Sequence, residues 1–316
     1  MFPTRCLPVA LLLLAVAAAD AQTLTPAAVV PAGASDVNGR LGWTLGQSSS
    51  VTFPSPENSI TSGVQQPEGV ELQLNIALLL QGPFDIATGL MHDSLRTRGL
   101  LPLQEPFTAL GHPAVGLQQG ARLEPEALLV SGPGALVDWV FLELRAADDP
   151  ALIIAARAAV VQRDGDVVDM DGLSPVHISV LPGSYHLALR HRNHLPVMTL
   201  APLALGTGVN TADLITGTPA LHVADAQAQQ GPHHLMRQGD VNGDGRVQYT
   251  GASNDRDPVL LAVGGVVPTQ TINGYHSADV NMDGTVKYTG SLNDRDPILI
   301  TIGGIVPTAV RSQPLP

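Results

Sequence analysis

Two short segments of the chain carry oxygen-bearing side chains at alternate positions, in the pattern Asp-x-Asn-x-Asp-Gly. The side chains are Asp240, Asn242 and Asp244 in the first segment and Asp279, Asn281 and Asp283 in the second. Side chains at alternate positions of a tight loop can converge on one point, and the glycine that follows them permits the sharp turn. Ca²⁺ prefers six to eight oxygen ligands at about 2.3–2.6 Å. The pattern therefore predicts a calcium loop in each segment.

An Asx-type turn that holds no ion is the alternative interpretation of each segment. A single copy would leave both interpretations open. Two copies in register, in a chain of net charge −12, favour calcium, because clustered carboxylates without a cation repel one another.

The remaining ligands depart from an EF-hand-type loop. The residue after each glycine would offer its backbone carbonyl, so its side chain is free to vary. These residues are Arg246 in the first copy and Thr285 in the second. The acid expected at position twelve is replaced by Gly251 or Gly290. We therefore expect an insertion of about four residues, Tyr-Thr-Gly-x, that delays the closing carboxylate to Asp255 and Asp294.

A second pair of acids, Asp257 and Asp296, offers the other choice of closing ligand. Each directly precedes a proline, Pro258 or Pro297. Because proline is favoured at the first helical position, we expect these two acids to be helix N-caps, not ligands. Short apolar helices should follow and end at paired glycines.

The two loops belong to a tandem duplication. Residues 239–269 and 278–308 align without a gap at an offset of 39, with 20 of 31 positions identical. Four of the differences exchange one of Val, Leu and Ile for another. We expect the two copies to pack around a shared apolar centre.

At these residues the sequence resembles the dockerin and EF-hand-like superfamily. It is similar also to the repeat tails of large uncharacterised secreted proteins of Gram-negative bacteria. The shared motifs are Asp-Val-Asn-x-Asp-Gly, Tyr-Thr-Gly and Asn-Asp-Arg-Asp-Pro-Ile-Leu, and the resemblance as a whole covers about a quarter of the chain. Dockerins bind cohesin domains, so the resemblance implies Ca²⁺ and, as an alternative function, a docking role. The inserted Tyr-Thr-Gly and the longer repeat depart from the dockerin pattern.

Three histidines, His186, His191 and His194, lie close together in the sequence and could suggest zinc. The segment has the pattern of a strand followed by a turn. An odd spacing places His186 and His191 on opposite faces of a strand, so we expect a polar hairpin end.

No catalytic motif is found. The chain lacks G-x-S-x-G and H-E-x-x-H, and its only cysteine is Cys6. A paired-carboxylate glycosidase leaves no sequence spacing, but aromatics make up only 3% of the chain, too few for the stacking platforms of sugar clefts. The acidic charge argues against nucleic acid, whose phosphates need a basic surface.

The N-terminus predicts export. Arg5, the apolar Val9–Ala19 and the small residues around Ala21 are typical of a signal peptide, and the apolar run is too short to span a bilayer. Cys6 lies inside this segment, so the exported chain would hold no disulfide and would take rigidity from its core or from bound ions.

Gly and Pro number 32 and 26, and short apolar runs alternate with turns over residues 71–202. These features predict a mainly β chain: an antiparallel β-sandwich followed by a small α-helical duplicated calcium-loop module. Trp139–Leu144 should be a strand buried on both faces, Leu90–Pro106 a long loop over the sheet, and Ala224–Gln230 one or two helical turns. The expected organisation is a signal peptide (1–21), a linker-like segment (22–70), the β-sandwich (71–202), a bridge (203–235) and the calcium module (236–310).

These observations together predict a secreted, cell-surface or periplasmic protein that is structural or interactive and not an enzyme. Its partner would be an extracellular protein or a glycan. The alternatives are a dockerin-like docking module and a glycan-binding or glycan-active protein.

Overall fold

The computed structural model describes residues 70–316, apart from 117–120, 224 and 314, and four short strands before residue 70. The chain divides into two compact units, Met1–Gly69 and Val70–Pro316. The strands of the first unit pair antiparallel as β1 (Ala32–Ser35) with β2 (Gly42–Leu45) and β3 (Val51–Pro54) with β4 (Ser59–Ser62). The predicted signal peptide, residues 1–21, lies outside the described residues.

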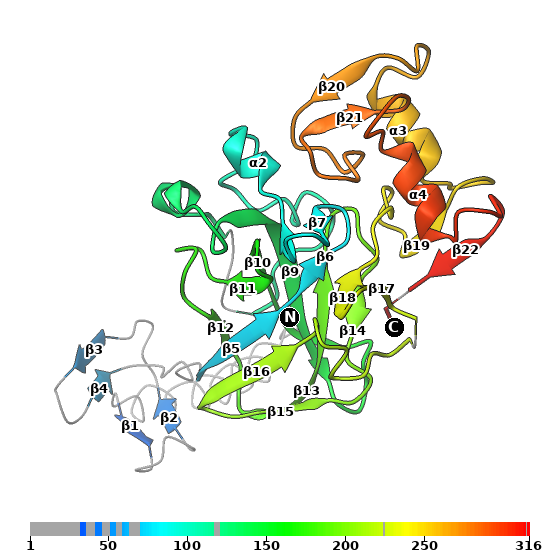
Figure 1. The fold of residues 1–316 in the computed structure, drawn as a ribbon. Coiled ribbons are helices and arrows are strands. Elements are labelled where there is room, and N and C mark those ends of the chain that lie inside the picture. The colour runs from blue at the N-terminus through cyan, green and yellow to red at the C-terminus, as the bar shows by residue number, and fades with distance from the viewer. Residues whose placement is uncertain are drawn as a thin grey trace, which may run out of the picture. The chain divides into compact units, whose positions relative to one another are not determined.

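The second unit is built on one large sheet (Figure 1). Its strands are β5 (Glu71–Ala77), β9 (Leu136–Ala146), β10 (Ile153–Gln162), β11 (Asp166–Val168), β12 (Val176–Ser179), β13 (Gly183–Arg190), β14 (Val197–Met198), β15 (Leu203–Leu205) and β16 (Val209–Asp213). The path runs β12-β5-β11-β10-β9-β13-β14, with β15 beside β13 and β16 beside β5. All pairs are antiparallel except β16 with β5. The prediction of a mainly β chain with antiparallel strands is confirmed.

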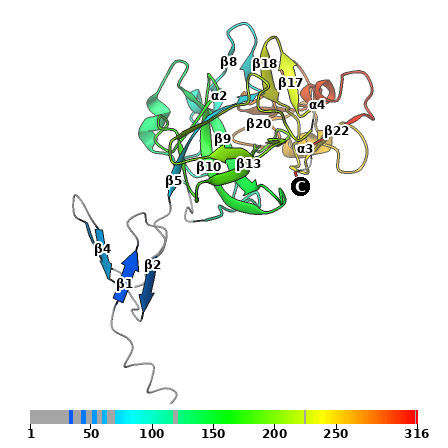
Figure 2. The same cartoon turned by 90° about the horizontal axis from the view of Figure 1, so that it is seen from below.

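The strand β9 lies at the centre of this sheet, between β10 and β13 (Figure 2). Every residue of β9 is buried, as its nearly continuous apolar run predicts. By contrast β5 alternates, with Leu72, Leu74 and Ile76 buried and Glu71 exposed.

Both faces of β9 are covered. On one side the sheet curls, because residues 206–208 alone connect β15 at one edge to β16 at the other. On the other side lies the long segment that includes the hairpin of β7 (Phe84–Asp85) and β8 (Leu90–Met91), the helical turn α2 (Ser94–Thr97) and the 3₁₀ turn η2 (Pro125–Leu129). The Trp139 indole donates to Pro102 O at 2.8 Å, and the rings of Phe107 and Phe141 lie 5.1 Å apart.

A smaller sheet joins β6 (Leu79–Leu80), β17 (Gln227–Gln230) and β18 (His233–Met236). The predicted helical turns over Ala224–Gln230 are therefore wrong. Gly231 takes a positive φ of 60° and turns the chain, so that β17 pairs antiparallel with β18. Pairing with a neighbouring strand outweighs the weak local preference of this segment for helix.

The C-terminal module, residues 239–313, holds one helix from each repeat, α3 (Arg256–Ala262) and α4 (Arg295–Thr301). Two short antiparallel pairs accompany them, β19 (Arg246–Gln248) with β22 (Val310–Ser312) and β20 (Thr271–Asn273) with β21 (Thr285–Lys287). Side chains from both repeats form one apolar cluster. Its buried members are Leu195, Val241, Val247, Val259, Val263, Ala278, Val280, Val286, Ile298 and Ile302.

In the part of the chain that the structure describes, no helix has the length and apolar character needed to cross a membrane.

Candidate metal centre

The first acidic loop follows β18 and leads into β19, and its side chains fold back onto its own backbone. Asp240 Oδ2 accepts a hydrogen bond from Gly245 N at 3.0 Å. Asn242 Oδ1 accepts from Asp244 N, and Asp244 Oδ1 from Arg246 N, each at 2.9 Å. These bonds hold the three side chains on a single turn of backbone.

The second loop repeats this geometry between residues 279 and 285. Asp279 Oδ2 accepts from Gly284 N at 2.8 Å, Asn281 Oδ1 from Asp283 N at 2.9 Å, and Asp283 Oδ1 from Thr285 N at 2.8 Å. The two copies thus adopt one local conformation, as their shared sequence leads one to expect.

A later acid bonds back to each loop. Asp255 is fully buried, and its carboxylate accepts from Val241 N at 2.8 Å and from Gln248 N at 2.9 Å. Asp294 is equally buried and accepts from Val280 N and Lys287 N, each at 2.7 Å. These two side chains join the start of each loop to the strand that follows it.

The prediction that Asp257 and Asp296 are helix N-caps is wrong. The amides of both residues lie inside the first helical turn, where they donate to the side chains of Asn254 and Asn293 at 2.9 Å. Asn254 Nδ2 donates in return to Asp257 Oδ2 at 2.8 Å. The asparagines therefore supply the capping oxygens. The pattern Asn-x-x-Asp, which resembles a capping box, was the available signal.

The two residues expected to offer backbone carbonyls begin short strands. Arg246 is exposed at the start of β19. Thr285 is half-buried at the start of β21, and its hydroxyl donates to Asn273 Oδ1 and accepts from Arg98 Nη1.

One buried oxygen in each loop lacks a hydrogen-bond partner. These atoms are Asp240 Oδ1 and Asp279 Oδ1, on side chains whose residues are 3% and 0% exposed. A buried carboxylate oxygen without a partner costs free energy, because it has lost its hydration without replacement. A cation beside each oxygen would remove that cost.

The carboxyl groups of the loops also favour a nearby cation. Burial raises the pKa of Asp240 to about 8, and the nearby Asp255 carboxylate adds to the rise. Burial also raises the pKa of Asp255 and of Asp294 to about 7. It raises the pKa of Asp279 to about 6, against the opposing charge of Arg192. Each loop thus holds two carboxyl groups whose charged forms are disfavoured unless a cation lies close.

Within the described residues, no three or more side chains of the His, Cys, Asp and Glu types form a group arranged as metal ligands. A cation at either loop would therefore take oxygens also from asparagine amides, backbone carbonyls and water. Ca²⁺ accepts all three, whereas zinc favours imidazole and thiolate.

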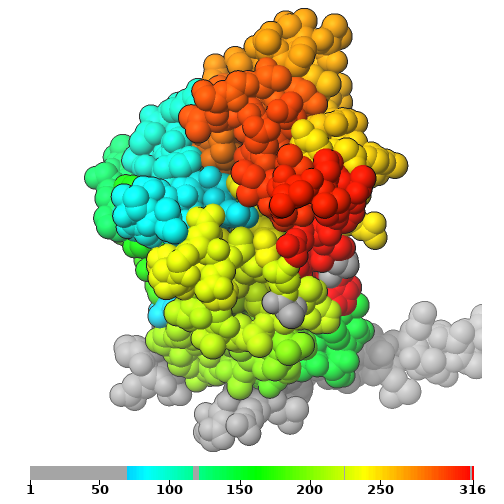
Figure 3. Space-filling model, turned by 45° about the vertical axis from the view of Figure 1, so that its right-hand side comes forward, coloured from blue at the N-terminus to red at the C-terminus, as the bar shows by residue number. Residues whose placement is uncertain are grey.

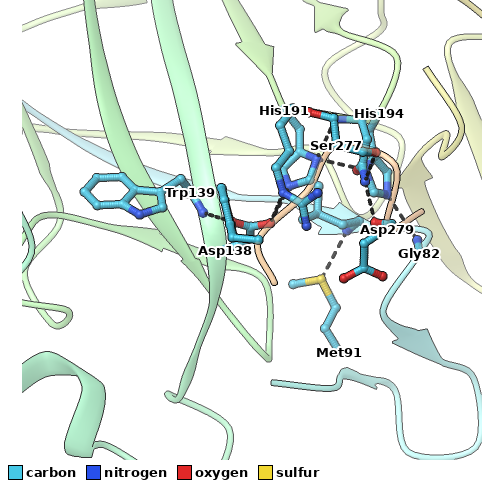
Figure 4. A network of polar contacts seen from close by, with 12 residues as sticks. Gly82, Met91, Asp138, Trp139, His191, His194, Ser277 and Asp279 are labelled. Carbon is cyan, nitrogen blue, oxygen red and sulfur yellow. Dashed lines mark hydrogen bonds and ion pairs between the residues drawn. The ribbon is translucent and has the colours of Figure 1, made fainter. Parts of the chain in front are cut away.

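His191 and His194 lie in a buried polar network (Figure 4), and among the described residues these histidines belong to no group of three or more metal-ligand side chains. Gly82 N donates to His194 Nε2 at 3.1 Å, His194 Nδ1 lies 2.9 Å from His191 Nδ1, and His191 Nε2 lies 3.1 Å from Asp138 Oδ2. His186 is separate and bonds Thr199 O through Nδ1. The expected polar hairpin end is wrong in one respect, because these imidazoles are buried.

Asp138 is the centre of this network, and sequence analysis missed it. Arg192 Nε donates to Asp138 Oδ2 at 2.9 Å, and the Tyr275 hydroxyl donates to Oδ1 at 2.6 Å. Asp138 thus links β9 to the C-terminal module. An acid inside an apolar run buried on both faces needs such partners, and this was the available signal.

Comparison with known proteins gives no match. Neither a protein-family model, nor a curated protein, nor a solved structure resembles this chain. The interpretation of the two loops therefore depends on their own geometry and charge.

Proposed function

We propose that this chain is an exported, non-enzymatic structural or interaction protein whose C-terminal module is stabilised by two Ca²⁺ ions, one at each acidic loop. The observation that carries the proposal is the pair of buried oxygens without partners, Asp240 Oδ1 and Asp279 Oδ1. They occupy the first position of each loop, while the other oxygen of each carboxylate bonds the loop glycine. This division leaves one oxygen of each aspartate for an ion.

The chemistry of the donors favours calcium over other divalent ions. The polar side chains of each loop are carboxylates and an asparagine amide, which are hard oxygen donors. The closing acids are Asp255 and Asp294, whose bonds to backbone N–H groups leave lone pairs that can still meet a cation. Because the ligands of each loop come from segments about 14 residues apart, the ion would stabilise the fold of the module.

A docking module is the second candidate, and exposed apolar side chains favour it. Leu261 and Ile300 occupy equivalent positions on α3 and α4 and are 73% and 60% exposed. Val266 and Ile305, in the loops after the two helices, are 84% and 87% exposed. A partner protein retained by the immobilised chain in Ca²⁺, and lost both with EDTA and in the Leu261→Ser, Ile300→Ser variant, would support docking.

The test is calorimetric titration of the full exported chain with Ca²⁺, comparing Asp255→Asn with Asp257→Asn. Both substitutions remove one negative charge. Asp257 is a matched control, because its side chain is 59% exposed and paired with Arg256. We expect wild type and Asp257→Asn to bind two ions, and Asp255→Asn to bind one.

Circular dichroism of each variant would confirm that it is folded. A wild-type chain that takes up no Ca²⁺ would refute the proposal. Loss of a site in Asp257→Asn but not in Asp255→Asn would show that the wrong acid has been assigned to the loop.

A further inference from the structure

The two loops share a conformation but have different surroundings. We call residues 70–238 the sheet domain. In the space-filling view, the orange atoms of the second repeat lie against the cyan atoms of the sheet domain (Figure 3). In the first loop Asn242 and Asp244 are exposed, whereas in the second Asn281 and Asp283 are half-buried.

The fourth position of the loop is the main difference. In the second loop it is Met282, which is 1% exposed and belongs to the apolar core of the large sheet. Its φ of 61° is unusual for a residue with a side chain, so burial in that core must offset the strain. In the first loop the position is Gly243, which is exposed and has no atom within 4 Å of a Cβ built there.

Polar side chains of the sheet domain also hold the backbone of the second loop. Arg98 Nη1 donates to Asp283 O at 2.5 Å, and His92 Nε2 bonds Asn281 O at 3.1 Å. Asn193 Nδ2 donates to Asp279 O at 2.6 Å. The carbonyls of the first, third and fifth loop positions are therefore fixed from outside the loop.

Close backbone packing adds to these bonds. A Cβ built on Gly82 would lie 2.3 Å from Val280 O, so only glycine allows the sheet domain and the second loop to approach this closely.

The first loop has fewer bonds to the sheet domain, of which one is donated by Gly239 N to Asn193 O at 2.9 Å. Among the described residues, no hydrogen bond joins residues 240–244 to the sheet. A cavity of about 100 Å³ lies between them, lined by loop residues on one side and by Leu110, His112 and Arg190 among others on the opposite side.

We infer that the two ions have different roles: Ca²⁺ at the second loop fixes the module onto the sheet domain, whereas Ca²⁺ at the first loop exchanges with solvent and leaves the sheet domain unchanged. This inference rests on the proposed calcium function. An ion that binds only the ordered second loop also favours the sheet-domain contacts that order it, by linkage. Among the described residues, 240–244 of the first loop make no such bonds, so its ion has less through which to act.

Hydrogen exchange of the full chain, followed by mass spectrometry, tests this division. The reporter is the segment 80–101, which holds Gly82, His92 and Arg98. In wild type, EDTA should speed exchange in this segment by about tenfold or more. Asp279→Asn should exchange at the faster rate even in Ca²⁺. Asp240→Asn should keep the slow rate at 80–101 while its own loop, 239–255, exchanges faster.

Two further variants separate the contact from the ion. Met282→Gly gives the second loop the residue of the first, and it should still bind two ions by calorimetry while EDTA no longer changes exchange at 80–101. Gly82→Ala should act in the same way through its clash with Val280 O. Gly208→Ala is the matched control, because no atom lies within 4 Å of a Cβ at that position.

The outcomes distinguish the two proposals. If calorimetry finds no Ca²⁺ bound to wild type, the proposed function fails and this inference fails with it. If two ions bind, but Asp240→Asn speeds exchange at 80–101 as much as Asp279→Asn does, the proposed function stands and the division of roles is wrong.

Discussion

Individual buried carboxylates in this molecule are of two kinds. Asp138 receives hydrogen bonds from Arg192, His191 and Tyr275, so its charge is fully matched inside the protein. Asp240, by contrast, keeps one buried oxygen without a partner. The first kind stabilises the fold without any ion, whereas the second is stable in its charged form only when a cation is close.

The matched carboxylate predicts acid sensitivity. Burial alone would raise the pKa of Asp138, but Arg192, with His191 and Tyr275, lowers it to about 2. The unfolded carboxyl has a pKa of about 3.9, so this stabilisation is complete above that value and is lost as the pH falls through about 2. In EDTA, the free energy of unfolding measured by urea titration should decrease by about 2 kcal/mol through this group as the pH falls over that range. In the variant Asp138→Asn, this part of the pH dependence of the free energy of unfolding should be missing. An unchanged pH dependence would contradict the lowered pKa of Asp138.

The two loops carry a positive side chain at different positions, Arg246 in the first loop and Lys287 in the second. Lys287 Nζ lies 3.8 Å from Asp283 Oδ2, and the equivalent residue of the first loop is the neutral Gln248. Removing this partly exposed positive charge should strengthen Ca²⁺ binding at the second loop, by about threefold to tenfold in Lys287→Gln. Calorimetry would measure this change in affinity. The reverse substitution, Gln248→Lys, should weaken Ca²⁺ binding at the first loop. Weaker binding in Lys287→Gln would contradict this account of the site.

At the scale of elements, the inserted Tyr-Thr-Gly joins the two repeats. Thr250 Oγ1 donates to Pro307 O, and Thr289 Oγ1 donates to Pro268 O, each at 2.9 Å. Each insertion thus reaches the loop after the helix of the other copy. The guanidinium groups of Arg256 and Arg295 lie 5.3 Å from the rings of the two inserted tyrosines, Tyr249 and Tyr288.

These cross-repeat bonds predict a symmetric loss of stability. Thr250→Val and Thr289→Val keep the side-chain shape but remove the donor, so each should lower the free energy of unfolding by about 0.5–1 kcal/mol. Urea titration in saturating Ca²⁺ would measure both. Thr271→Val, at an exposed position on β20, is the control and should change little. If both threonine variants matched the control, the bonds would not contribute to stability.

Local patterns predicted some elements and failed on others for physical reasons. The alternation of Leu72, Leu74 and Ile76 marks β5, and the apolar run around Trp139 marks β9, because burial follows strand geometry directly. The segment Gln227–Gln230 carries no such pattern, and its strand exists through pairing with β18. An acid directly before proline favours Asp257 and Asp296 as caps, whereas in the structure the side chains of Asn254 and Asn293 cap the helices.

For the larger unit as a whole, residues 70–316 are one compact body, and the sequence patterns predict a sandwich, a bridge and a calcium module along them. The contacts that join them connect residues far apart in sequence: His92 and Asn281 are 189 positions apart, and Arg98 and Asp283 are 185. No local pattern encodes such pairs. The similar sequences of the two repeats likewise do not predict the burial of Met282, because only the surrounding fold makes the two loops different.

The most direct test of the central claim is the number of Ca²⁺ ions held by the full chain, counted by native mass spectrometry and by equilibrium dialysis. We predict two ions in wild type, one in either Asp240→Asn or Asp279→Asn, and none in the double variant. The matched substitution Asp296→Asn, at an acid paired with Arg295 and exposed, should retain two. A wild-type chain that holds no Ca²⁺ at millimolar concentrations, or a double variant that still holds two ions, would contradict the account.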